Sequence, residues 1–385
     1  MNRKLRMGMI GGGQGAFIGA VHRIVAAMDG QIELVAGAFS SDPNKSQQTG
    51  AALFLDPERV YGSYEAMIAQ EKGLSADKKI DIVCIVTPNH LHFEPAAMAL
   101  RNGFHVVLEK PATFTLEEAR KLHDLVAETR LQLLLCHTYT GYPMVKEARH
   151  LVQSGALGKI RKVYVEYPQG WLSTDLEDSG HKQASWRTDP SRSGKAGAMG
   201  DIGTHAFNLA EYVSGLEVTH ICADIQTVVE GRQLDDDGAA LLRFNNGATG
   251  VLMATQVAAG EENNVKIRVY GELGGLEWQQ EDANSLVLKW PDKPKTVLRT
   301  GGPGLSPVAM HNTRTPAGHP EGYLEAFANL YRNFACTLQA LAAGTVPPDA
   351  CLDFPGTREG VRGMAFIDSV IHSGQSDQKW IEFKA

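Results

Sequence analysis

Two patterns of apolar residues divide the chain near residue 136. In the first part, short and almost continuously apolar runs alternate with stretches of helical periodicity. Such runs are typical of strands that helices cover on both faces, and their alternation with helices predicts βαβ units and a parallel sheet. We therefore expect residues 1–136 to form a doubly wound α/β domain. The expected strands are residues 7–10, 32–38, 80–87, 105–108 and 131–135, and the expected helices include residues 93–102 and 116–129, the latter with a capping box of Thr115 and Glu118.

In the second part, residues 137–385, apolar and polar residues alternate over longer runs. Turn signals at residues 237–238 and 245–247 separate several of these runs, which indicates antiparallel pairing. We expect an α+β domain built on an open, mainly antiparallel sheet. Residues 301–322 are rich in Gly and Pro and are predicted to form a lid or binding loop. The expected strands are residues 162–166, 219–229, 239–244, 250–256, 266–270, 285–290 and 380–383, and the expected helices are residues 144–153, 323–343 and 356–373.

Composition narrows the class of protein. The 385 residues are 43% hydrophobic and 21% charged, and no stretch approaches the roughly 20 apolar residues needed to cross a bilayer. The net charge of -7 argues against nucleic acid as a partner, because nucleic-acid-binding proteins usually carry a clustered positive surplus. A small neutral or weakly charged ligand fits better. The first apolar run breaks at once into glycines and lacks the core of a secretory signal, so we expect a cytoplasmic protein.

The cysteines are scattered along the chain. Their number, five, is odd and none stands in CxxC spacing, which disfavours both a disulfide framework and a zinc site. We therefore expect five reduced, mostly buried thiols and no bound metal. The five residues are Cys84, Cys136, Cys222, Cys336 and Cys351.

Glycines follow the first predicted strand in the segment MGMIGGGQGAFIGAVH. Gly11, Gly13 and Ala16 match the pattern G-x-G-x-x-G/A, in which glycines let backbone amides approach a pyrophosphate at the positive end of the next helix. A structural turn is the alternative, but the place of the motif between a strand and a helix favours dinucleotide binding. The expected contacts with NAD or NADP are Gly11, Gly13, Gly15, Ala16, Phe17 and Ile18.

The end of the second predicted strand bears on the choice between NAD and NADP. An acidic residue about 20 positions after the glycines usually holds the ribose of NAD. Ser40 and Ser41 occupy this place, with Lys45 nearby, and this favours the 2′-phosphate of NADP, although Asp42 could still serve NAD. A helix cap formed by Ser41 or Asp42 is an equally good interpretation for either residue.

The motif TPNHLH, residues 87–92, stands at the carboxyl end of a predicted strand, where ligands bind in open α/β sheets. We expect it to lie close to the cofactor. For His92 taken alone, a satisfied structural histidine is the better interpretation. The expected cofactor contacts are Thr87, Pro88, Asn89 and His92.

The motif LEKPA, residues 108–112, ends the following strand. Pro111 favours an extended conformation at Lys110, so the lysine amine would project into the cleft from a fixed base. A surface lysine is the alternative. Glu109 and Lys110 are expected near the cofactor, and Lys110 is a candidate catalytic residue.

The motif GDIGTH, residues 200–205, places Asp201 and His205 four residues apart at the start of a predicted helix. Residues at this spacing lie on the same side of a helix, and an acid beside an imidazole suits proton transfer. The alternative is a carboxylate favoured by the helix dipole together with an ordinary buried histidine.

Together and in this order, the glycine loop, TPNHLH, EKP and GDIGTH resemble the Gfo/Idh/MocA family over nearly the whole chain. The resemblance implies a Rossmann domain, a second domain for substrate binding and oligomerisation, and hydride transfer between NAD(P) and a CH–OH group of a sugar, inositol or related polyol. The segment SWRTDPSRSGKAGAMGDIGTHA is similar to the inositol dehydrogenase and levoglucosan dehydrogenase branches. Ser40 departs from the aspartate of the family pattern, which leaves the choice of cofactor open.

The resemblance also implies roles for individual residues. Lys110 would position and polarise the reacting oxygen, Asp201 would orient the substrate and His205 would act as general acid/base. A homodimer or homotetramer is expected, because second-domain sheets in this family often pack face to face. The positions that line the sugar site in the family correspond to Tyr139, Tyr142, Gln169, Trp186 and Arg187, with His319 and Glu321 as further candidates.

Two other functions are compatible with the same scaffold. Some relatives hydrolyse glycosides by transient oxidation with tightly held NAD, and a catalytically silent nucleotide sensor is a third possibility. The presence of Lys110, Asp201 and His205 argues against the silent protein, since a pure binder has no need of all three. The leading hypothesis is an NAD(P)-dependent dehydrogenase or reductase.

Overall fold

The computed structural model describes residues 3–177 and 182–385, and the chain forms two compact units. Unit 1 combines Met1–Cys136 with Phe327–Val361, and unit 2 combines His137–Ala326 with Arg362–Ala385. The structure corrects the predicted division for one segment, because residues 327–361 were expected in the second domain and cluster with the first.

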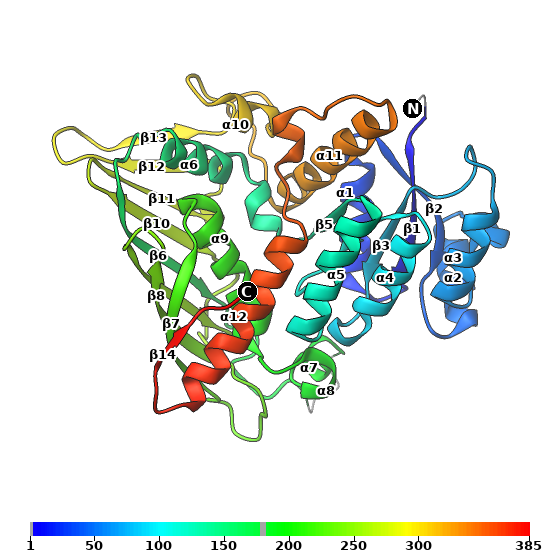
Figure 1. Ribbon diagram of the computed structural model, residues 1–385, viewed down its shortest axis with the longest axis horizontal. Helices are drawn as coiled ribbons and strands as arrows, with labels where there is room; N and C mark the ends of the chain where they lie inside the picture. Colours follow the sequence, from blue (N-terminus) through cyan, green and yellow to red (C-terminus); the bar gives the residue numbers. More distant parts are fainter. Residues whose placement is uncertain (1–2, 178–181) are drawn as a thin grey trace. The chain divides into compact units, whose positions relative to one another are not determined.

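Unit 1 contains a five-stranded sheet in the order β2-β1-β3-β4-β5, whose neighbouring strands run parallel (Figure 1). The predicted doubly wound sheet is therefore confirmed. The strand order reverses between β1 and β3, and the carboxyl ends of such strands form the switch point at which open α/β sheets bind ligands. The strands are β1 (Leu5–Gly11), β2 (Ile32–Ala38), β3 (Ile82–Val86), β4 (His105–Leu108) and β5 (Leu133–Leu135).

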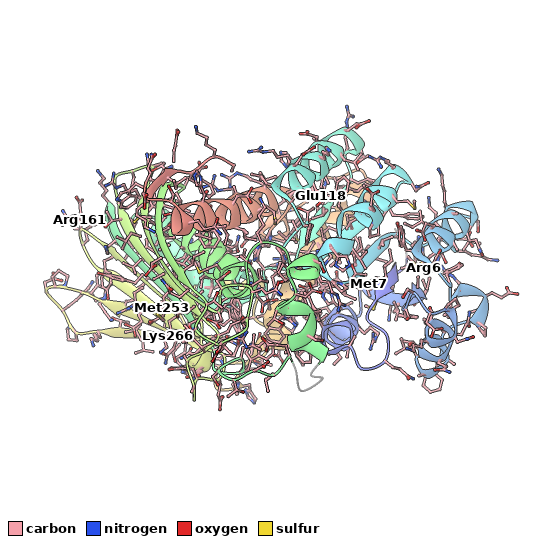
Figure 2. The ribbon with its side chains drawn as sticks, turned by 90° about the horizontal axis from the view of Figure 1, so that it is seen from below. Arg6, Met7, Glu118, Arg161, Met253 and Lys266 are labelled. Atoms are coloured by element: carbon pink, nitrogen blue, oxygen red, sulfur yellow. A yellow bond between two sulfur atoms is a disulfide. The ribbon has the colours of Figure 1, made fainter. Side chains whose placement is uncertain are left out.

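Helices connect these strands in the βαβ manner that the sequence predicts. Helix α5 begins with the predicted capping box: Thr115 Oγ1 accepts from the Glu118 N–H over 3.2 Å, and the Glu118 carboxylate accepts from the Thr115 N–H over 3.0 Å. Glu118 lies in the first turn of this helix (Figure 2). The helices are α1 (Phe17–Met28), α2 (Pro43–Ala52), α3 (Tyr64–Gly73), α4 (Phe93–Arg101) and α5 (Leu116–Thr129), with short 3-10 helices η1 (Pro57–Arg59) and η2 (Asn89–Leu91).

Helix α11 (Tyr323–Ala342) brings the returning segment of the chain into unit 1. Its Tyr331 ring contacts His22 of α1 at a centroid distance of 5.8 Å, and its Phe334 ring contacts His105 at the start of β4 at 6.5 Å. A parallel sheet needs helices on both faces, and α11 contributes to one of them. This need for cover is the physical reason that residues 327–361 join the first unit.

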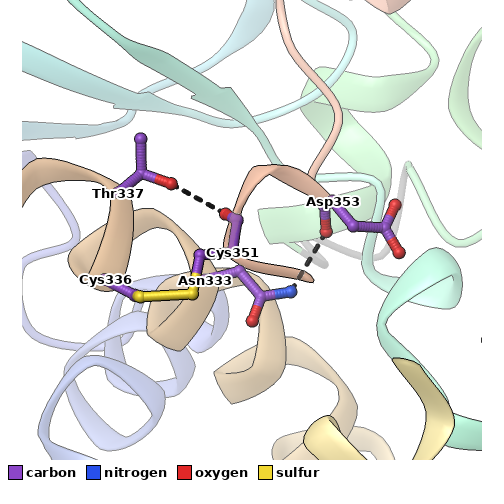
Figure 3. The surroundings of a disulfide bond; sticks show 5 residues. All are labelled: Asn333, Cys336, Thr337, Cys351 and Asp353. Atoms are coloured by element: carbon purple, nitrogen blue, oxygen red, sulfur yellow. Dashed lines mark hydrogen bonds between the residues drawn. A yellow bond between two sulfur atoms is a disulfide. The ribbon is translucent and has the colours of Figure 1, made fainter. Parts of the chain in front are cut away.

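A disulfide joins Cys336 of α11 to Cys351 of the 3-10 helix η6 (Asp349–Leu352) (Figure 3). Thr337 Oγ1 donates to the Cys351 carbonyl over 2.8 Å and ties the same two elements together. The prediction of reduced thiols is wrong for this pair, because the chain reverses after α11 and brings the two Cα atoms to 5.8 Å. The other three cysteines are free: Cys84 and Cys136 are buried, and Cys222 is partly exposed.

Unit 2 contains a nine-stranded sheet in the order β13-β12-β11-β10-β6-β9-β8-β7-β14 (Figure 1). Among the described strand pairs, β6 and β9 run parallel and the others antiparallel, which confirms the predicted open, mainly antiparallel sheet. The strands are β6 (Ile160–Pro168), β7 (Val218–Gln226), β8 (Asp237–Phe244), β9 (Thr249–Thr255), β10 (Lys266–Gly271), β11 (Gly275–Gln279), β12 (Ser285–Lys289), β13 (Thr296–Arg299) and β14 (Trp380–Glu382).

The sheet of unit 2 differs from the prediction at three places, namely two strands and one turn. Strands β11 and β13 were not predicted from the apolar pattern. The turn expected at residues 245–247 joins β8 to β9, but the turn expected at residues 237–238 is wrong because these residues begin β8. A small residue is needed at Gly238, since a Cβ there would lie 2.9 Å from the Met199 sulfur.

Helices cover one face of this sheet, and the other face is more exposed. Buried and exposed residues alternate along β8, as expected for such a sheet. Helix α9 packs on β6, β9 and α6, and α12 packs beside α9 through the stacked rings of Phe207 and Phe366, 4.7 Å apart. The helices are η3 (Thr138–Gly141), α6 (Pro143–Gln153), α7 (Lys182–Arg187), α8 (Pro190–Ser193), the π-helix η4 (Met199–Gly203), α9 (Thr204–Ser214), η5 (Gln280–Asp282), α10 (Pro307–His311) and α12 (Thr357–Gln375).

The Gly- and Pro-rich residues 301–322 are more ordered than the predicted loop. They contain α10, whose N-cap Ser306 accepts through its Oγ from the Ala309 N–H over 3.3 Å. The Ser306 N–H donates to the buried carboxylate of Glu147 in α6 over 2.9 Å, which anchors the segment. Across the described ranges, we find no helix of the length and apolar character that a membrane span requires.

Candidate functional site

The glycine loop of unit 1 leaves open space beside the first turn of α1. Gly12 and Gly19 lie so close together that a Cβ on Gly19 would be 2.4 Å from the Gly12 Cα. A Cβ on Gly15, whose φ is +76°, would by contrast meet nothing within 4 Å. The N-cap Ala16 makes no side-chain hydrogen bond, and the first turn of α1, which is fully described, has no acidic residue. Open space and first-turn N–H groups without intrahelical partners fit an anion such as a pyrophosphate.

Side chains outside the motif support this loop. Arg23 Nη1 donates to the Gly12 carbonyl over 2.8 Å, and Thr49 Oγ1 accepts from the Gln14 N–H over 3.4 Å. Sequence reasoning missed both Arg23 and Thr49, because a single arginine or threonine within a helix carries no motif. The predicted contacts Gly11, Gly13, Gly15, Ala16, Phe17 and Ile18 all lie between the end of β1 and the first turn of α1.

The residues that follow β2 form a helix cap. Asp42 is the N-cap of α2, and its Oδ1 accepts from the N–H groups of Asn44 and Lys45 over 2.9 and 3.4 Å. Ser40 Oγ accepts from the Asp42 N–H over 3.1 Å. The helix cap that was one interpretation of Asp42 is therefore present in the structure. Ser41 lies exposed in the preceding bend. The Lys45 ammonium lies 4.0 Å from the Asp42 carboxylate, on the exposed first turn of α2.

The TPNHLH and EKP motifs are joined by His92. This buried ring places Nδ1 at 2.8 Å from the Pro111 carbonyl and Nε2 at 2.9 Å from the Thr87 carbonyl. Burial lowers the pKa of His92, although the two carbonyls act in the opposite direction. The geometry is that of a structural histidine, as the sequence favours for His92 alone. Pro88 is the N-cap of η2, and Asn89 is its first residue.

Glu109 and Lys110 follow the last residue of β4. The Glu109 Oε1 lies 2.8 Å from His22 Nε2, and its Oε2 accepts from the Lys110 N–H over 3.0 Å. Burial would raise the pKa of Glu109, but His22 and Lys110 outweigh it and hold the pKa below the usual value. A charged carboxylate is thus built into the chain directly before the lysine.

In unit 2, Asp201 lies in η4 and His205 lies in the first turn of α9. The start of η4 is fixed by Asp235, whose carboxylate accepts from the N–H groups of Gly197 and Met199 over 2.7 and 2.8 Å. Burial raises the pKa of Asp235, although these N–H groups act against the shift. Asp235 is therefore a supporting residue of the Asp201 turn that the sequence did not reveal.

The Asp201 carboxylate accepts two side-chain hydrogen bonds on one oxygen. Arg187 Nε donates to Oδ2 over 3.2 Å, and Gln256 Nε2 donates to it over 3.0 Å. The Arg187 guanidinium also lies 4.5 Å from the Trp186 ring centroid. The structure thus brings together three of the predicted substrate residues, Asp201, Arg187 and Trp186.

Gln256 extends this arrangement to Gln169. The Gln169 Oε1 accepts from Gln256 Nε2 over 3.3 Å and from Trp171 Nε1 over 3.0 Å. The Gln169 Nε2 donates in turn to Asn263 Oδ1 over 2.5 Å. A continuous chain of neutral amides therefore runs from Asp201 through Gln256 and Gln169 to Asn263, and the Trp171 indole joins it at Gln169.

Tyr139 connects the same chain to His205. Asn263 Nδ2 donates to the Tyr139 hydroxyl over 3.3 Å, and this hydroxyl also bonds the Tyr167 hydroxyl. The Tyr139 ring meets the His205 ring edge-on at 4.9 Å, and His205 Nδ1 lies 3.4 Å from His137 Nδ1. One network in unit 2 thus contains six of the predicted substrate residues: Tyr139, Gln169, Trp186, Arg187, Asp201 and His205.

The remaining candidates, Tyr142, His319 and Glu321, have other surroundings. Tyr142 is buried and its ring stacks on Tyr139 at 6.4 Å. His319 is exposed, and its Nδ1 lies 3.2 Å from the Pro316 carbonyl. The Glu321 carboxylate accepts from the Thr315 N–H over 2.7 Å and so organises its own segment. Sequence reasoning missed five members of the network, namely His137, Tyr167, Trp171, Gln256 and Asn263.

The two parts of the chain match the two domains of one enzyme family. Residues 5–137 match the oxidoreductase family with an NAD-binding Rossmann fold, and residues 145–277 match the GFO/IDH/MocA C-terminal domain. A crystal structure of an oxidoreductase from Sinorhizobium meliloti is 43% identical, with a TM-score of 0.89 over 99% of this chain and 100% of that chain. This chain belongs to the Gfo/Idh/MocA family of oxidoreductases.

Other Gfo/Idh/MocA relatives have described ligands or activities. A crystal structure of an inositol dehydrogenase homologue from Azotobacter vinelandii, complexed with NADH and myo-inositol, is 33% identical, with a TM-score of 0.91 over 100% of this chain and 98% of that chain. The levoglucosan dehydrogenase of Pseudarthrobacter phenanthrenivorans is 28% identical over 74% of this chain and 76% of that protein. The suspected family is confirmed, and the chain is an oxidoreductase with an NAD-binding fold.

Proposed function

We propose that this Gfo/Idh/MocA member transfers a hydride between NAD(P) and a CH–OH group of a sugar, inositol or related polyol. The observation that carries the proposal is the polar network of unit 2, in which Asp201, with Arg187 and Gln256 on one oxygen, is linked to His205. It supplies a fixed carboxylate and an imidazole, the two groups that alcohol oxidation needs for orientation and proton transfer.

The glycine loop supports a dinucleotide as the cofactor. The open space at Gly15 and the uncapped first turn of α1 suit a pyrophosphate, and the nicotinamide supplies the hydride acceptor or donor when it is bound. Either NAD or NADP fits the proposal. Ser40 carries no charge that would repel a 2′-phosphate, and Lys45 could attract one, so we propose that NADP is accepted.

The catalytic roles follow from the chemistry of a secondary alcohol. Its oxidation removes a hydride from carbon and a proton from oxygen. We assign the proton to His205, the polarisation of the reacting oxygen to Lys110 and the orientation of the substrate to Asp201. The His205 ring is held by Tyr139 and His137, which limits the directions from which a proton can be exchanged.

A neutral polyhydroxyl compound suits the remaining groups of the network. Amides, hydroxyls and an indole N–H both donate and accept hydrogen bonds without adding net charge. The relatives named for inositol and levoglucosan support the same class. We propose that Tyr139, Gln169, Trp186 and Arg187 contact the substrate hydroxyls.

We further propose that the protein is a homodimer or homotetramer that uses the exposed face of the unit 2 sheet. Leu241 and Val297 on this face are 47% and 54% exposed. Between them, the strand registers align Val251, Tyr164, Arg268, Glu277 and Val287 into one row across the sheet, so the row has apolar ends and a charged pair within it. Multi-angle light scattering tests the proposal against the 41.7 kDa of one chain.

The decisive test is the formation of NADH or NADPH by the purified protein with inositols, aldoses and anhydrosugars. Reduction of the nicotinamide with at least one of these compounds is the expected result. Release of sugar from an aryl glycoside without net reduction of the nicotinamide would instead establish the glycosidase. Cofactor binding without either reaction would contradict both the dehydrogenase and the glycosidase function.

A further inference from the structure

Three side chains from distant parts of the sequence form a buried hydrogen-bonded chain in unit 1. His22 of α1 lies at its centre. The His22 Nε2 is 2.8 Å from the Glu109 carboxylate after β4, and the His22 Nδ1 is 2.5 Å from the Tyr331 hydroxyl of α11. The Cys84 sulfur of β3 lies 3.4 Å from both His22 Nδ1 and the Tyr331 hydroxyl.

The side chains of this hydrogen-bonded chain are buried, so a charge on His22 needs a partner. His22 is 0% exposed and Tyr331 is 1% exposed, while the Glu109 side chain retains 12%. Burial would lower the pKa of His22, but Cys84 and Glu109 outweigh it and raise the pKa to about 10. An imidazolium can donate from both ring nitrogens, which matches the two oxygen partners of His22. A buried charge of this kind persists only when it is paired, and Glu109 pairs it.

The hydrogen-bonded chain ends at the backbone N–H of Lys110. Strand β4 stops at Leu108, and its last register pair is Leu108 with Ile85 of β3. Beyond it, the Glu109 N–H donates to the Ile85 carbonyl over 3.2 Å, and the Lys110 N–H donates to Glu109 Oε2 over 3.0 Å. A main-chain N–H past the end of a ladder needs another acceptor, and this carboxylate supplies it.

We propose that the chain Tyr331–His22–Glu109 is a positioning device that fixes the backbone at Lys110 and thereby aims the lysine ammonium. The inference rests on the proposed function, since it gives these residues their effect through Lys110. His22, Glu109 and Tyr331 are positioning residues and need not touch the substrate. Helix α11 takes part in the reaction through Tyr331 although it comes from the far end of the chain.

A metal site is the competing interpretation of the same donors. His22, Glu109 and Cys136 each offer one ligand atom, and these three atoms lie within 4.8 Å of one another. A metal would have to displace the proton between His22 and Glu109, and the raised pKa of His22 means that this proton is held tightly. The ion pair therefore accounts for the geometry better than a metal does.

A double-mutant cycle tests the device on the whole protein. We expect His22→Asn to lower kcat about tenfold to a hundredfold, because a small displacement of a catalytic group has effects of this size, with little change in KM for the nucleotide. In the Lys110→Ala background the same substitution should have almost no further effect on kcat. An equal loss in both backgrounds would overturn the proposal, since it would show that His22 acts independently of Lys110.

His105→Asn is the matched control for a general disturbance of the fold. His105 is partly buried, lies at the opposite end of β4 and contacts α11 through Phe334. It should change kcat much less than His22→Asn. Tyr331→Phe, which removes only the hydroxyl, should lower kcat in the same direction as His22→Asn and lose its effect in Lys110→Ala. Stoichiometric zinc in the purified wild-type protein that is lost in Glu109→Gln would overturn the proposal in favour of a metal site.

A measurement without turnover separates this proposal from the proposed function. After reductive ¹³C-methylation, the Lys110 signal is assigned as the one missing from Lys110→Ala. Its chemical shift should move in His22→Asn and stay in place in His105→Asn, whether or not any alcohol is oxidised. An unmoved signal in His22→Asn would overturn the positioning role even if wild-type turnover establishes the dehydrogenase.

Discussion

Lys110 and Asp201 are held by two different kinds of support. In unit 1, a nearly buried carboxylate and an imidazolium fix the backbone before Lys110, with side-chain exposures of 12% for Glu109 and 0% for His22. In unit 2, the Asp201 carboxylate is 17% exposed and accepts from the Arg187 guanidinium and the neutral amide of Gln256. Buried charges give strong but pH-dependent support, whereas amides do not titrate, so the two supports should fail under different conditions.

The largest expected effect concerns one proposed catalytic residue of each unit, Lys110 in unit 1 and His205 in unit 2. Lys110→Ala and His205→Ala should each lower kcat by roughly 10²- to 10⁴-fold, the range typical of lost acid–base or electrostatic catalysis. Nucleotide affinity should change little, because neither substitution alters the glycine loop. Steady-state kinetics and nucleotide titration check both parts. Near-normal turnover in both variants would remove these residues from the active site.

The second effect is the pH dependence of the unit 1 support. The pKa of His22 is raised from 6.5 to about 10, so its stabilisation is fully present below pH 6.5 and is lost as the pH rises through about 10. The free energy of unfolding should fall over this window by an amount on the order of a few kcal/mol. Urea titrations of the wild type and His22→Asn should differ at pH 6.5 and converge toward pH 10.

His105→Asn is the control for this measurement as well. Burial lowers the pKa of His105 to about 4, so its contribution to stability is present above pH 6.5 and is lost as the pH falls. The His105→Asn curve should therefore run parallel to the wild type between pH 6.5 and 10. Parallel curves for His22→Asn in the same range would contradict a charged His22.

The third effect concerns the disulfide that closes the segment after α11. Its cysteines are separated by 15 residues. For a loop of this size, we expect the free energy of unfolding to fall by about 3 kcal/mol when both cysteines are replaced by serine. Cys222→Ser should leave stability almost unchanged, because Cys222 is free and partly exposed. Equal urea midpoints for the double variant and the wild type would show that the bond does not contribute.

The fourth effect tests the amide support of unit 2. Gln256→Leu removes one donor to Asp201 and should lower kcat/KM about tenfold, the cost of one hydrogen bond to a charged group. This loss should be similar from pH 6.5 to 9, unlike the effect of His22. Gln226→Leu, on the exposed end of β7, is the matched control. If the loss of kcat/KM in Gln256→Leu varied steeply with pH, the two supports would not differ in their pH dependence.

The fifth effect, of about the same size as the fourth, concerns the cofactor. Ser40→Asp should raise the ratio of kcat/KM for NAD to that for NADP about tenfold, because the carboxylate can accept from the ribose hydroxyls and repels a 2′-phosphate. The ratio can be measured for the wild type and for Ser40→Asp with one substrate at one pH. An unchanged ratio would place the adenosine ribose away from Ser40.

The sequence predicts best where one local pattern decides the structure. Residues 32–38, 105–108 and 116–129 form the elements expected of them, because continuous apolar runs and a capping box act within a few residues. The antiparallel sheet was likewise visible as alternation. The turn predicted at Asp237 and Gly238 is wrong, because these residues start β8 and the glycine is needed there for close packing against Met199.

The sequence predicts less where distant residues decide the structure. The motif residues Lys110, Asp201 and His205 could be named, but their supports could not. Gln256 and Asn263 are single amides without a pattern around them, and His22 stands in a glycine motif that suggests only phosphate binding. The pairing of Cys336 with Cys351 likewise depends on how the chain reverses after α11.

The return of residues 327–361 to unit 1 has a consequence for recombination between relatives. A nucleotide-binding module cut from the gene at codon 136 would lack α11 and with it Tyr331, one of the two oxygen partners of His22. A chimera with a cofactor module from another family member should therefore exchange two separate gene segments at once. Natural exchange by a single crossover is disfavoured for the same reason, so the two parts of unit 1 are expected to be inherited together.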